Sequence, residues 1–321
     1  MVASSESTQA AWKVPPIAVV LLAGASWWLI GYLPWVLTGL NGSDYSLRGV
    51  ELTTAVPLMA HTVPYVLTFG LIGGLCASGS RLIAGPRTPR TWVPSLIGMV
   101  AAVTAALVQS GIVGATADDQ PISGAQSGFF AALCVACVLG SLVGWGLGIL
   151  MTRGAAWAGL TLSVLVGVVG PWAIALVTTY LGHAGHLHDF DDPATQNVAD
   201  LLTWQLDAVL ALALIVIGAR PARRLALWPV AILVSWFAYV PASLMGLLAF
   251  NALGEDLFYR SSFSEWMSDL VVPNTDMLLH LGASLVTAGI VTGALAYRRW
   301  RQASGYSDGR ANAPVTVAER R

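Results

Sequence analysis

Residues 127–151 read SGFFAALCVACVLGSLVGWGLGILM, a stretch without a single charged side chain. An apolar run of about 20 residues or more is long enough for a helix to cross the hydrocarbon core of a bilayer. Strands of membrane barrels are about half that length and alternate between apolar and polar residues. Because lipid offers no hydrogen bonds, the backbone of such a run must satisfy itself within a helix. The stretch therefore predicts a transmembrane helix.

Seven further apolar segments of similar length surround this one. The eight predicted spans are about 14–38, 55–78, 93–115, 127–151, 157–181, 201–219, 228–250 and 273–296. Only 10% of the 321 residues are charged and 56% are hydrophobic, too little charge to cover the surface of a soluble domain. The first segment is too long for the core of a signal peptide, and no small-residue cleavage site follows it. We expect an all-α integral membrane protein with eight transmembrane helices.

The charges of the loops predict an orientation. The short loops after the even spans are basic and hold Arg81, Arg87, Arg90, Arg153, Arg220, Arg223, Arg224, Arg298, Arg299 and Arg301. The longer loops after the odd spans are mostly acidic, and their basic residues are Arg48 and Arg260. Since positively charged loops stay in the cytoplasm, we predict four helical hairpins with both termini cytoplasmic. The acidic outer face would attract cations.

The ends of the chain differ from the transmembrane domain, which we place at residues 12–300. Residues 1–11 and 301–321 are polar and poor in large apolar side chains, so we predict disordered cytoplasmic tails there. Lys13 is the single lysine beside many arginines, a bias typical of GC-rich genomes. These features favour a multi-pass protein of a bacterial plasma membrane. The net charge of −1 gives no indication of nucleic-acid binding.

Polar side chains inside the spans are the strongest functional pointers, because titratable groups are costly in hydrocarbon. The candidate binding residues are His61, Tyr65, Asp207, Tyr239, Asp276 and His280. Of these, His61, Asp207, Asp276 and His280 lie in the predicted outer halves of their spans. Asp276 and His280 share one helix face because they are four residues apart. If these spans converge, the side chains line a polar cavity in the outer half of the bundle. The alternatives are hydrogen bonding between helices and simple hydration at the interface.

The loop after the fifth predicted span is rich in histidine and aspartate. Its candidate metal ligands are His183, His186, His188, Asp189, Asp191 and Asp192. Imidazole and carboxylate groups could hold a divalent cation such as zinc, copper or nickel. A flexible polar loop without any ligand has the same composition. Within the spans no recognised haem or metal spacing occurs, so we do not expect a haem.

Three glycines of the fourth predicted span repeat every four residues, at Gly140, Gly144 and Gly148. Such a ridge of small residues allows a second helix to approach closely. The approaching helix could belong to the same chain, to a second copy or to another membrane protein. In the same span, Cys134 and Cys137 form a C-x-x-C pattern, which in a transmembrane helix is most often a matter of packing.

Three functions fit these features. The first is a transporter, or the permease subunit of one, with a polar His/Asp site that binds a proton or a cation. The second is a non-catalytic membrane subunit that scaffolds or regulates an envelope or respiratory complex. The third is an outer-leaflet enzyme that uses a histidine as general base on a lipid-linked substrate. Nucleotide-binding, hydrolase and zincin motifs are absent from the sequence, so the two functions without catalysis rank first.

Overall fold

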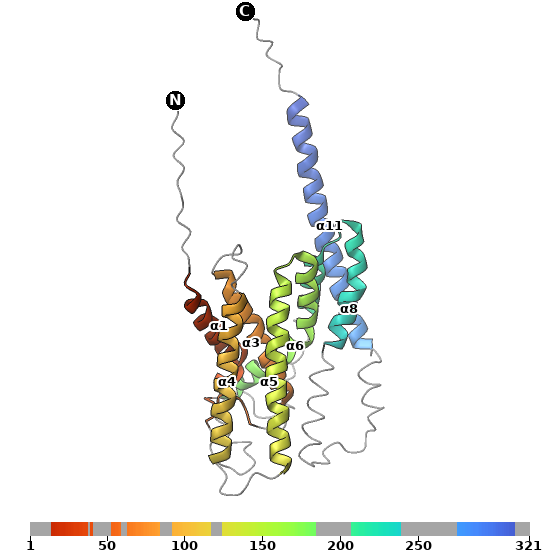
Figure 1. Cartoon of the computed structure of the whole chain (residues 1–321). Coiled ribbons are helices and arrows are strands. Elements are labelled where there is room, and N and C mark those ends of the chain that lie inside the picture. Colours follow the sequence, from red (N-terminus) through yellow and green to blue (C-terminus); the bar gives the residue numbers. More distant parts are fainter. Residues whose placement is uncertain are drawn as a thin grey trace, which may run out of the picture.

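The computed structural model describes residues 14–37, 39–40, 53–58, 63–83, 92–116, 124–183, 207–238 and 275–311. Its helices are α1 (Pro16–Gly31), α2 (Leu33–Leu37), α3 (Val63–Ile83), α4 (Trp92–Thr116), α5 (Gly124–Met151), α6 (Ala155–His183), the helix Asp207–Ile217, the 3-10 helix η3 (Ala222–Ala226), α8 (Leu227–Phe237) and α11 (Thr275–Ala311). Almost all of the described residues are helical, as the apolar runs predict (Figure 1).

Four helices in the described part of the chain are long and apolar enough to cross a membrane. They are Trp92–Ala115, Gly128–Met151, Ala155–Val177 and Leu278–Gln302. These ranges fall within or close to the third, fourth, fifth and eighth predicted spans. The helix Asp207–Ile217 is a shorter apolar helix inside the sixth predicted span. The structure therefore confirms that the described part of the chain is almost entirely helical and contains helices that are long and apolar enough to span a membrane.

The first predicted span, 14–38, is not one continuous helix. It divides at Tyr32, where α1 ends and the short helix α2 begins. Pro34 has no N–H group to donate to the carbonyl of Ile30, so the ladder of helical hydrogen bonds is interrupted at this point. The backbone still turns tightly, because the Tyr32 N–H donates to the Trp28 carbonyl at 3.0 Å.

Two other predicted boundaries also differ from the structure. The second span was expected from residue 55, but α3 begins at Val63 and residues 53–58 are non-helical. Pro64 suits the first turn of α3, where no N–H partner is required. At the other end of the chain, α11 continues to Ala311 through the first half of the tail that we expected to be disordered. Lengthening an existing helix adds one backbone hydrogen bond for each residue that becomes ordered, and it avoids the cost of nucleating a new helix.

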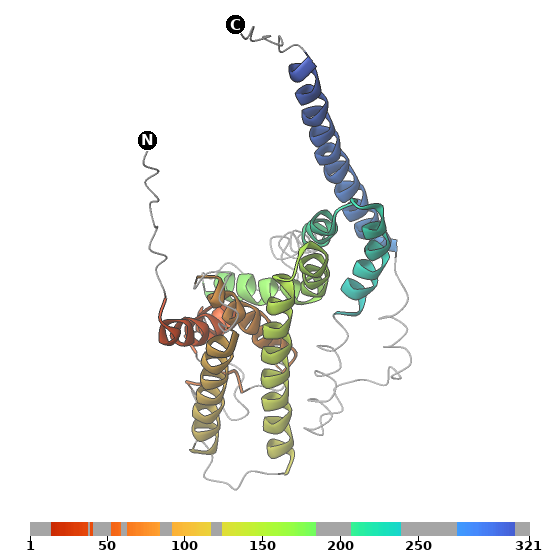
Figure 2. The same cartoon turned by 45° about the horizontal axis from the view of Figure 1, so that its top comes forward.

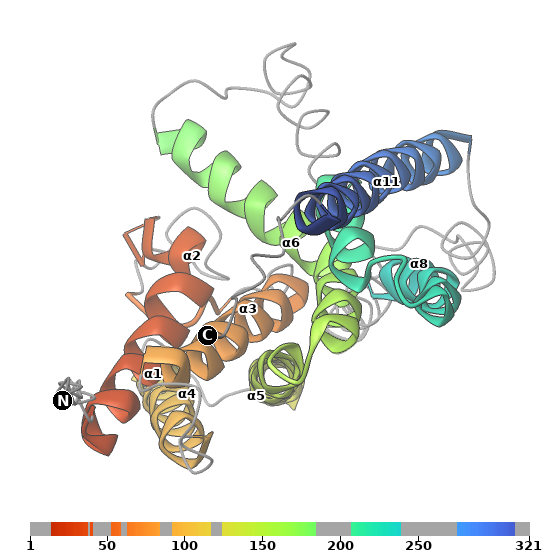
Figure 3. The ribbon, with the colours of Figure 1, turned by 90° about the horizontal axis from the view of Figure 1, so that it is seen from above.

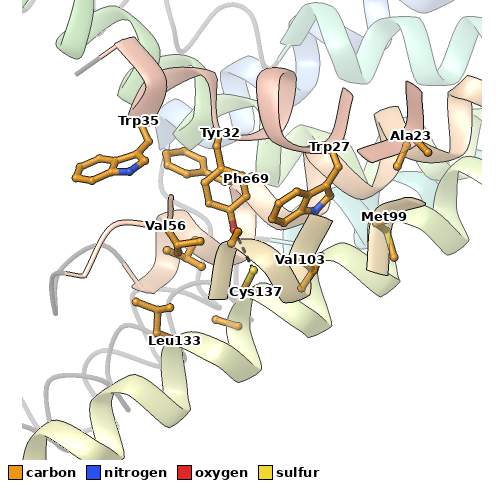
Figure 4. Packing of buried hydrophobic residues seen from close by; sticks show 14 of the residues in the cluster. Ala23, Trp27, Tyr32, Trp35, Val56, Phe69, Met99, Val103, Leu133 and Cys137 are labelled. Carbon is orange, nitrogen blue, oxygen red and sulfur yellow. Dashed lines mark hydrogen bonds between the residues drawn. The ribbon is translucent and has the colours of Figure 1, made fainter. Parts of the chain in front are cut away.

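Helices α1, α3, α4 and α5 form the first of two packed groups. Viewed from above, α4 and α5 are seen nearly end-on, and α1 and α3 lie across them (Figure 3). Large side chains fill the space between these helices, and the buried ones include Trp27, Tyr32, Phe69, Met99, Leu133 and Cys137 (Figure 4). This set, with its buried neighbours, is called the aromatic core below.

Glycines bring α3 and α5 into backbone contact. A Cβ atom added to Gly144 of α5 would overlap the carbonyl of Leu71 on α3, and one added to Gly140 would overlap the carbonyl of Leu67. Gly148 lies against the side chain of Ser78, also on α3. On α3, Gly74 faces the backbone of Ser141 in return. The helix that packs against the glycine ridge is thus α3 of the same chain.

The second group consists of the helix Asp207–Ile217, α8 and α11, packed against α6. Their shared core contains Leu210, Leu214, Ile217, Ala231 and Ala288 and is called the C-terminal core below. Figures 1 and 2 show the C-terminal part of α11 extending past the other helices.

Helix α6 connects the two groups. It changes direction along its length (Figure 3), and its interior contains Pro171, a residue that kinks helices. Beyond this position, the indole of Trp172 donates to the carbonyl of Gly31 at 3.0 Å, at the junction of α1 and α2. On the other side of Pro171, Gly159 packs closely against the helix Asp207–Ile217.

The glycine contact predicts a selective loss of stability. We expect Gly144→Ala to lower the free energy of unfolding by about 1–3 kcal/mol, because the methyl group overpacks a backbone contact. Gly146 has no atom within 4 Å of an added Cβ. The matched control Gly146→Ala should therefore be neutral or stabilising by up to about 1 kcal/mol. Unfolding of the detergent-solubilised variants measures both, and equal stability would contradict the packing.

Candidate functional site

The aromatic core contains a buried chain of hydrogen bonds. The indole N–H of Trp27 donates to Ser141 Oγ at 2.8 Å, and that hydroxyl donates to the carbonyl of Cys137 at 2.7 Å. The Tyr32 hydroxyl lies 3.1 Å from Cys137 Sγ (Figure 4). Every polar atom in this chain has a partner, which is the arrangement expected of structural hydrogen bonds between helices.

A second set of polar contacts holds the non-helical residues 53–56. The Gln109 side chain of α4 accepts from the Ala55 N–H at 2.7 Å and donates to the Thr53 carbonyl at 3.0 Å. Next to it, Ser110 Oγ accepts from the Val56 N–H at 3.0 Å. One amide side chain here replaces the pair of hydrogen bonds that a neighbouring strand would supply.

Two tryptophans complete this set from α1 and α2. Trp35 donates to the Thr54 carbonyl at 2.7 Å, and Trp28 donates to the Ala55 carbonyl at 3.2 Å. We call Gln109, Ser110, Trp28 and Trp35 the backbone clamp. Non-helical backbone that lies among apolar helices needs hydrogen-bond partners from the protein, and the clamp supplies them. Sequence reasoning missed the clamp, although an amide side chain inside the apolar run 93–115 is a signal for it.

An aspartate and a histidine from different helices meet in the second group. His280 Nδ1 of α11 lies 2.6 Å from Asp207 Oδ2, at the start of the helix Asp207–Ile217. The side chains are 27% and 13% exposed, respectively. The distance is that of a short, charge-assisted hydrogen bond.

Ser284 joins the same pair. It lies one turn after His280, so both side chains project from one face of α11. Its hydroxyl, 1% exposed as a residue, donates to the Asp207 backbone carbonyl at 3.2 Å and lies 3.3 Å from Oδ1. Both carboxylate oxygens of Asp207 are thus engaged by α11.

The surroundings of the pair are apolar. Leu210 on the helix of Asp207, and Leu281, Leu285 and Ala288 on α11, belong to or pack against the C-terminal core. Among the described residues, no group of three or more His, Cys, Asp or Glu side chains is close enough to hold a metal ion. The arrangement can bind and release a proton, or hydrogen-bond a small polar solute.

The structure thus brings together two of the six candidate binding residues, Asp207 and His280. Asp276 is on α11, one turn before His280. Tyr65 lies elsewhere, packed against the aromatic core with its ring 6.3 Å from that of Phe69.

The remaining candidates fall on parts of the chain that are not described. His61 and Tyr239 lie outside the described residues, as do His186, His188, Asp189, Asp191 and Asp192 of the histidine-rich loop. His183 is the last residue of α6. A divalent metal in that loop stays a prediction from the sequence.

No family model matches the chain, and no curated protein or solved structure matches it. Function is therefore inferred from the residues of this chain alone.

Loss of the backbone clamp should lower the stability of the protein. We expect Gln109→Leu to lower the free energy of unfolding by about 1–3 kcal/mol, because it leaves the part-buried Ala55 N–H without its partner. Thr104 on the same helix is exposed, so Thr104→Val is a matched control and should change little. Denaturant titration of both variants in micelles gives the comparison. A Gln109 variant as stable as the control would mean that the clamp contributes nothing.

Proposed function

We propose that the protein is a transporter of a bacterial plasma membrane, or the permease subunit of one, and that Asp207 and His280 form its binding site. The observation that carries the proposal is the 2.6 Å contact between these side chains across two helices. Ionisable residues inside apolar bundles are costly, and they mark ion and substrate pathways in membrane proteins. Coupled transporters place such groups between helices that move relative to one another.

A cation is the solute or coupling ion that the charges favour. The long predicted outer loops are acidic, and Asp207 supplies a carboxylate between helices. A negative surface raises the local concentration of cations and speeds their arrival.

The alternative role as a scaffold has less support. The surface that the sequence suggested for a partner was the ridge of Gly140, Gly144 and Gly148. In the structure, α3 of the same chain packs against that ridge. A partner protein or a second copy would have to use another face. We therefore favour transport.

We further propose eight spans in four hairpins with both termini cytoplasmic. Support comes from arginines at helix ends on one side of the bundle, the side toward which α11 extends (Figure 1). Arg81 donates to the carbonyls of Gly148 and Ile149 at 3.4 and 3.3 Å, and to the Thr152 hydroxyl. Arg224 donates to the carbonyl of Ile217 at 3.4 Å. Cations are favourable at helix C-termini, and arginine-rich ends face the cytoplasm.

Transport can be tested in liposomes. The purified protein is reconstituted around a pH-sensitive dye, and gradients of metal cations, organic ammonium compounds and amino acids are imposed in turn. We expect at least one cationic solute to enter the wild-type liposomes and to change the internal pH. In Asp207→Asn and His280→Gln, uptake should fall to the level of protein-free liposomes, because the first variant removes the carboxylate of the site and the second removes its imidazole.

Thr292→Ala is the control for these variants, since within the described part of the chain the Thr292 hydroxyl bonds to carbonyls of its own helix, those of Ala288 and Gly289. It should transport like the wild type. A wild-type protein that moves no member of the panel, or site variants that keep full uptake, would refute the proposed function.

The orientation has its own test. Reporters that are active on only one side of the membrane are fused after residue 321 and after residues 118, 153 and 224. We expect cytoplasmic activity at 153, 224 and 321 and external activity at 118, because the arginine-rich loops stay inside. The reverse result at any two positions would overturn the proposed topology.

A further inference from the structure

We propose that Arg81 and Arg153 bind the headgroup phosphate of an anionic phospholipid, where α3 and α5 end on the arginine-rich side of the bundle. The site is separate from the Asp207–His280 pair and does not depend on the transport function. It gives the two arginines a ligand as well as an influence on orientation.

Arg81 is anchored at the C-terminus of α5 through one nitrogen of its guanidinium group. Its Nη2 donates to the carbonyls of Gly148 and Ile149 at 3.4 and 3.3 Å, and to the Thr152 hydroxyl. That hydroxyl donates its own proton to the Ile149 carbonyl at 2.8 Å, so it holds Arg81 in place and has no proton left for a ligand. Among the described residues, Nη1 and Nε of Arg81 meet no acceptor. Both remain available as donors to an anion.

Arg153 lies beside this anchor, in the turn between α5 and α6. It follows Thr152 directly, and its backbone N–H donates to the Leu150 carbonyl at 2.9 Å. Gly154 then takes a φ of +138°, a conformation that residues with a side chain rarely adopt, and α6 begins at Ala155. Arg153 is exposed at this turn. The tight turn thus holds an exposed arginine close to the anchored one.

Two positive charges close together repel each other, and an anion between them would offset the repulsion. Arg81 lies beyond the second predicted span, and its pKa is lowered first by burial and then by the charge of Arg153. Within the described ranges, neither arginine forms an ion pair with a carboxylate. From residue 52 to residue 188 the sequence has two acidic residues, Asp118 and Asp119, both in the predicted outer loop after the third span. In the described part of the chain, the neutralising anion is thus left to a ligand.

The depth of the two arginines points to a lipid headgroup. The turn Thr152–Gly154 lies between two helices that are long and apolar enough to cross a membrane, Gly128–Met151 and Ala155–Val177. Trp92 at the start of α4 and Trp157 at the start of α6 are 44% and 48% exposed. Exposed tryptophans are typical of the headgroup level of a membrane. Since lipid phosphates lie at the same level, a phospholipid reaches both arginines without leaving the bilayer.

The charge of the site selects an anionic lipid. Phosphatidylcholine carries an ammonium group that two arginines would repel, whereas phosphatidylglycerol combines its phosphate with a neutral glycerol. The side of the membrane to which the arginine-rich loops are assigned is also the one with the negative surface. Leu82 follows Arg81 in the chain and is 55% exposed, so it offers apolar surface to the acyl chains.

Native mass spectrometry of the detergent-solubilised, full-length protein tests the site. The probes are phosphatidylglycerol and phosphatidylcholine with the same acyl chains. We expect the wild type to bind phosphatidylglycerol about tenfold more tightly than phosphatidylcholine, or better. In Arg153→Gln, the affinity for phosphatidylglycerol should fall about fivefold because one of two cations is lost, and the affinity for phosphatidylcholine should not change. Arg153→Lys, which keeps the charge, should retain most of the preference.

Arg223→Gln is the matched control. Arg223 is an exposed arginine of η3, in the other group of helices, and the substitution removes the same charge. It should change the affinity for phosphatidylglycerol by less than about twofold, because the residue is not part of the site. An equal loss in Arg153→Gln and Arg223→Gln would mean that any arginine attracts the lipid, which would overturn the specific site.

Arg81→Gln should weaken the binding of phosphatidylglycerol at least as much as Arg153→Gln, because it removes the anchored cation. It also removes contacts between α3 and α5, so it is read only in protein that is folded. Arg153→Gln decides the inference in either case. Arg153 is exposed, and among the described residues only its backbone N–H is hydrogen-bonded.

Inorganic phosphate separates a lipid site from a site for a free anion. An excess of it should leave phosphatidylglycerol bound, because inorganic phosphate lacks the acyl chains. Displacement of the lipid by an equal concentration of phosphate would overturn the inference, as would equal affinities of the wild type for the two lipids. Either result would leave the transport function standing, since the Asp207–His280 pair takes no part in the site.

Discussion

Lipid offers no hydrogen bonds, so polar groups among apolar helices need partners within the protein. The described part of the chain supplies such partners between its helices. Tryptophan supplies much of what is needed, because its indole combines a large apolar surface with one donor. Trp27, Trp145 and Trp172 each donate to an oxygen on a different helix. These contacts tie α1 to α5, α5 to α4 and α6 to α1. Apolar packing alone would not distinguish these helices from lipid, so the indoles add specificity to the assembly.

Close packing follows from the same constraint. Helix α3 lies against both α1 and α5, and glycines on two of its faces let both helices approach closely. This close approach allows the Ser141 hydroxyl of α5 to reach Trp27 of α1. Gly73 faces α1, and Gly70 and Gly74 face α5. A larger residue at any of these positions would push the helices apart and break the hydrogen bonds between them. The glycines of α3 and the ridge of α5 are therefore conditions for the polar contacts, as well as packing features.

The sequence predicted the helices best where hydrophobicity alone decides the structure. Helices α4, α5 and α6 begin and end within about three residues of the predicted spans, since their apolar runs are uninterrupted. The first two spans depart from the prediction because Pro34 interrupts one helix and side chains of other helices support residues 53–58 in a non-helical form. Such support depends on tertiary contacts, which periodicity does not reveal.

In the candidate site too, the sequence predicted which residues stand out but not which of them come into contact. Asp207 and His280 could be selected from the sequence because ionisable residues are rare inside apolar runs, and the four-residue spacing already put Ser284 on the face of His280. Their pairing could not be predicted, because it depends on how two helices 73 positions apart in the chain are docked. Tyr65 was selected from the sequence in the same way, yet it packs against the aromatic core because α3 belongs to the other group of helices.

The backbone clamp also has a consequence for how the protein is made. Its donors and acceptors come from α1, α2 and α4, while the segment that they hold precedes α3 in the chain. Until α4 is in place, the Ala55 N–H lacks Gln109 and the Val56 N–H lacks Ser110. This short segment therefore takes its described conformation only after a helix that lies later in the chain has packed against it.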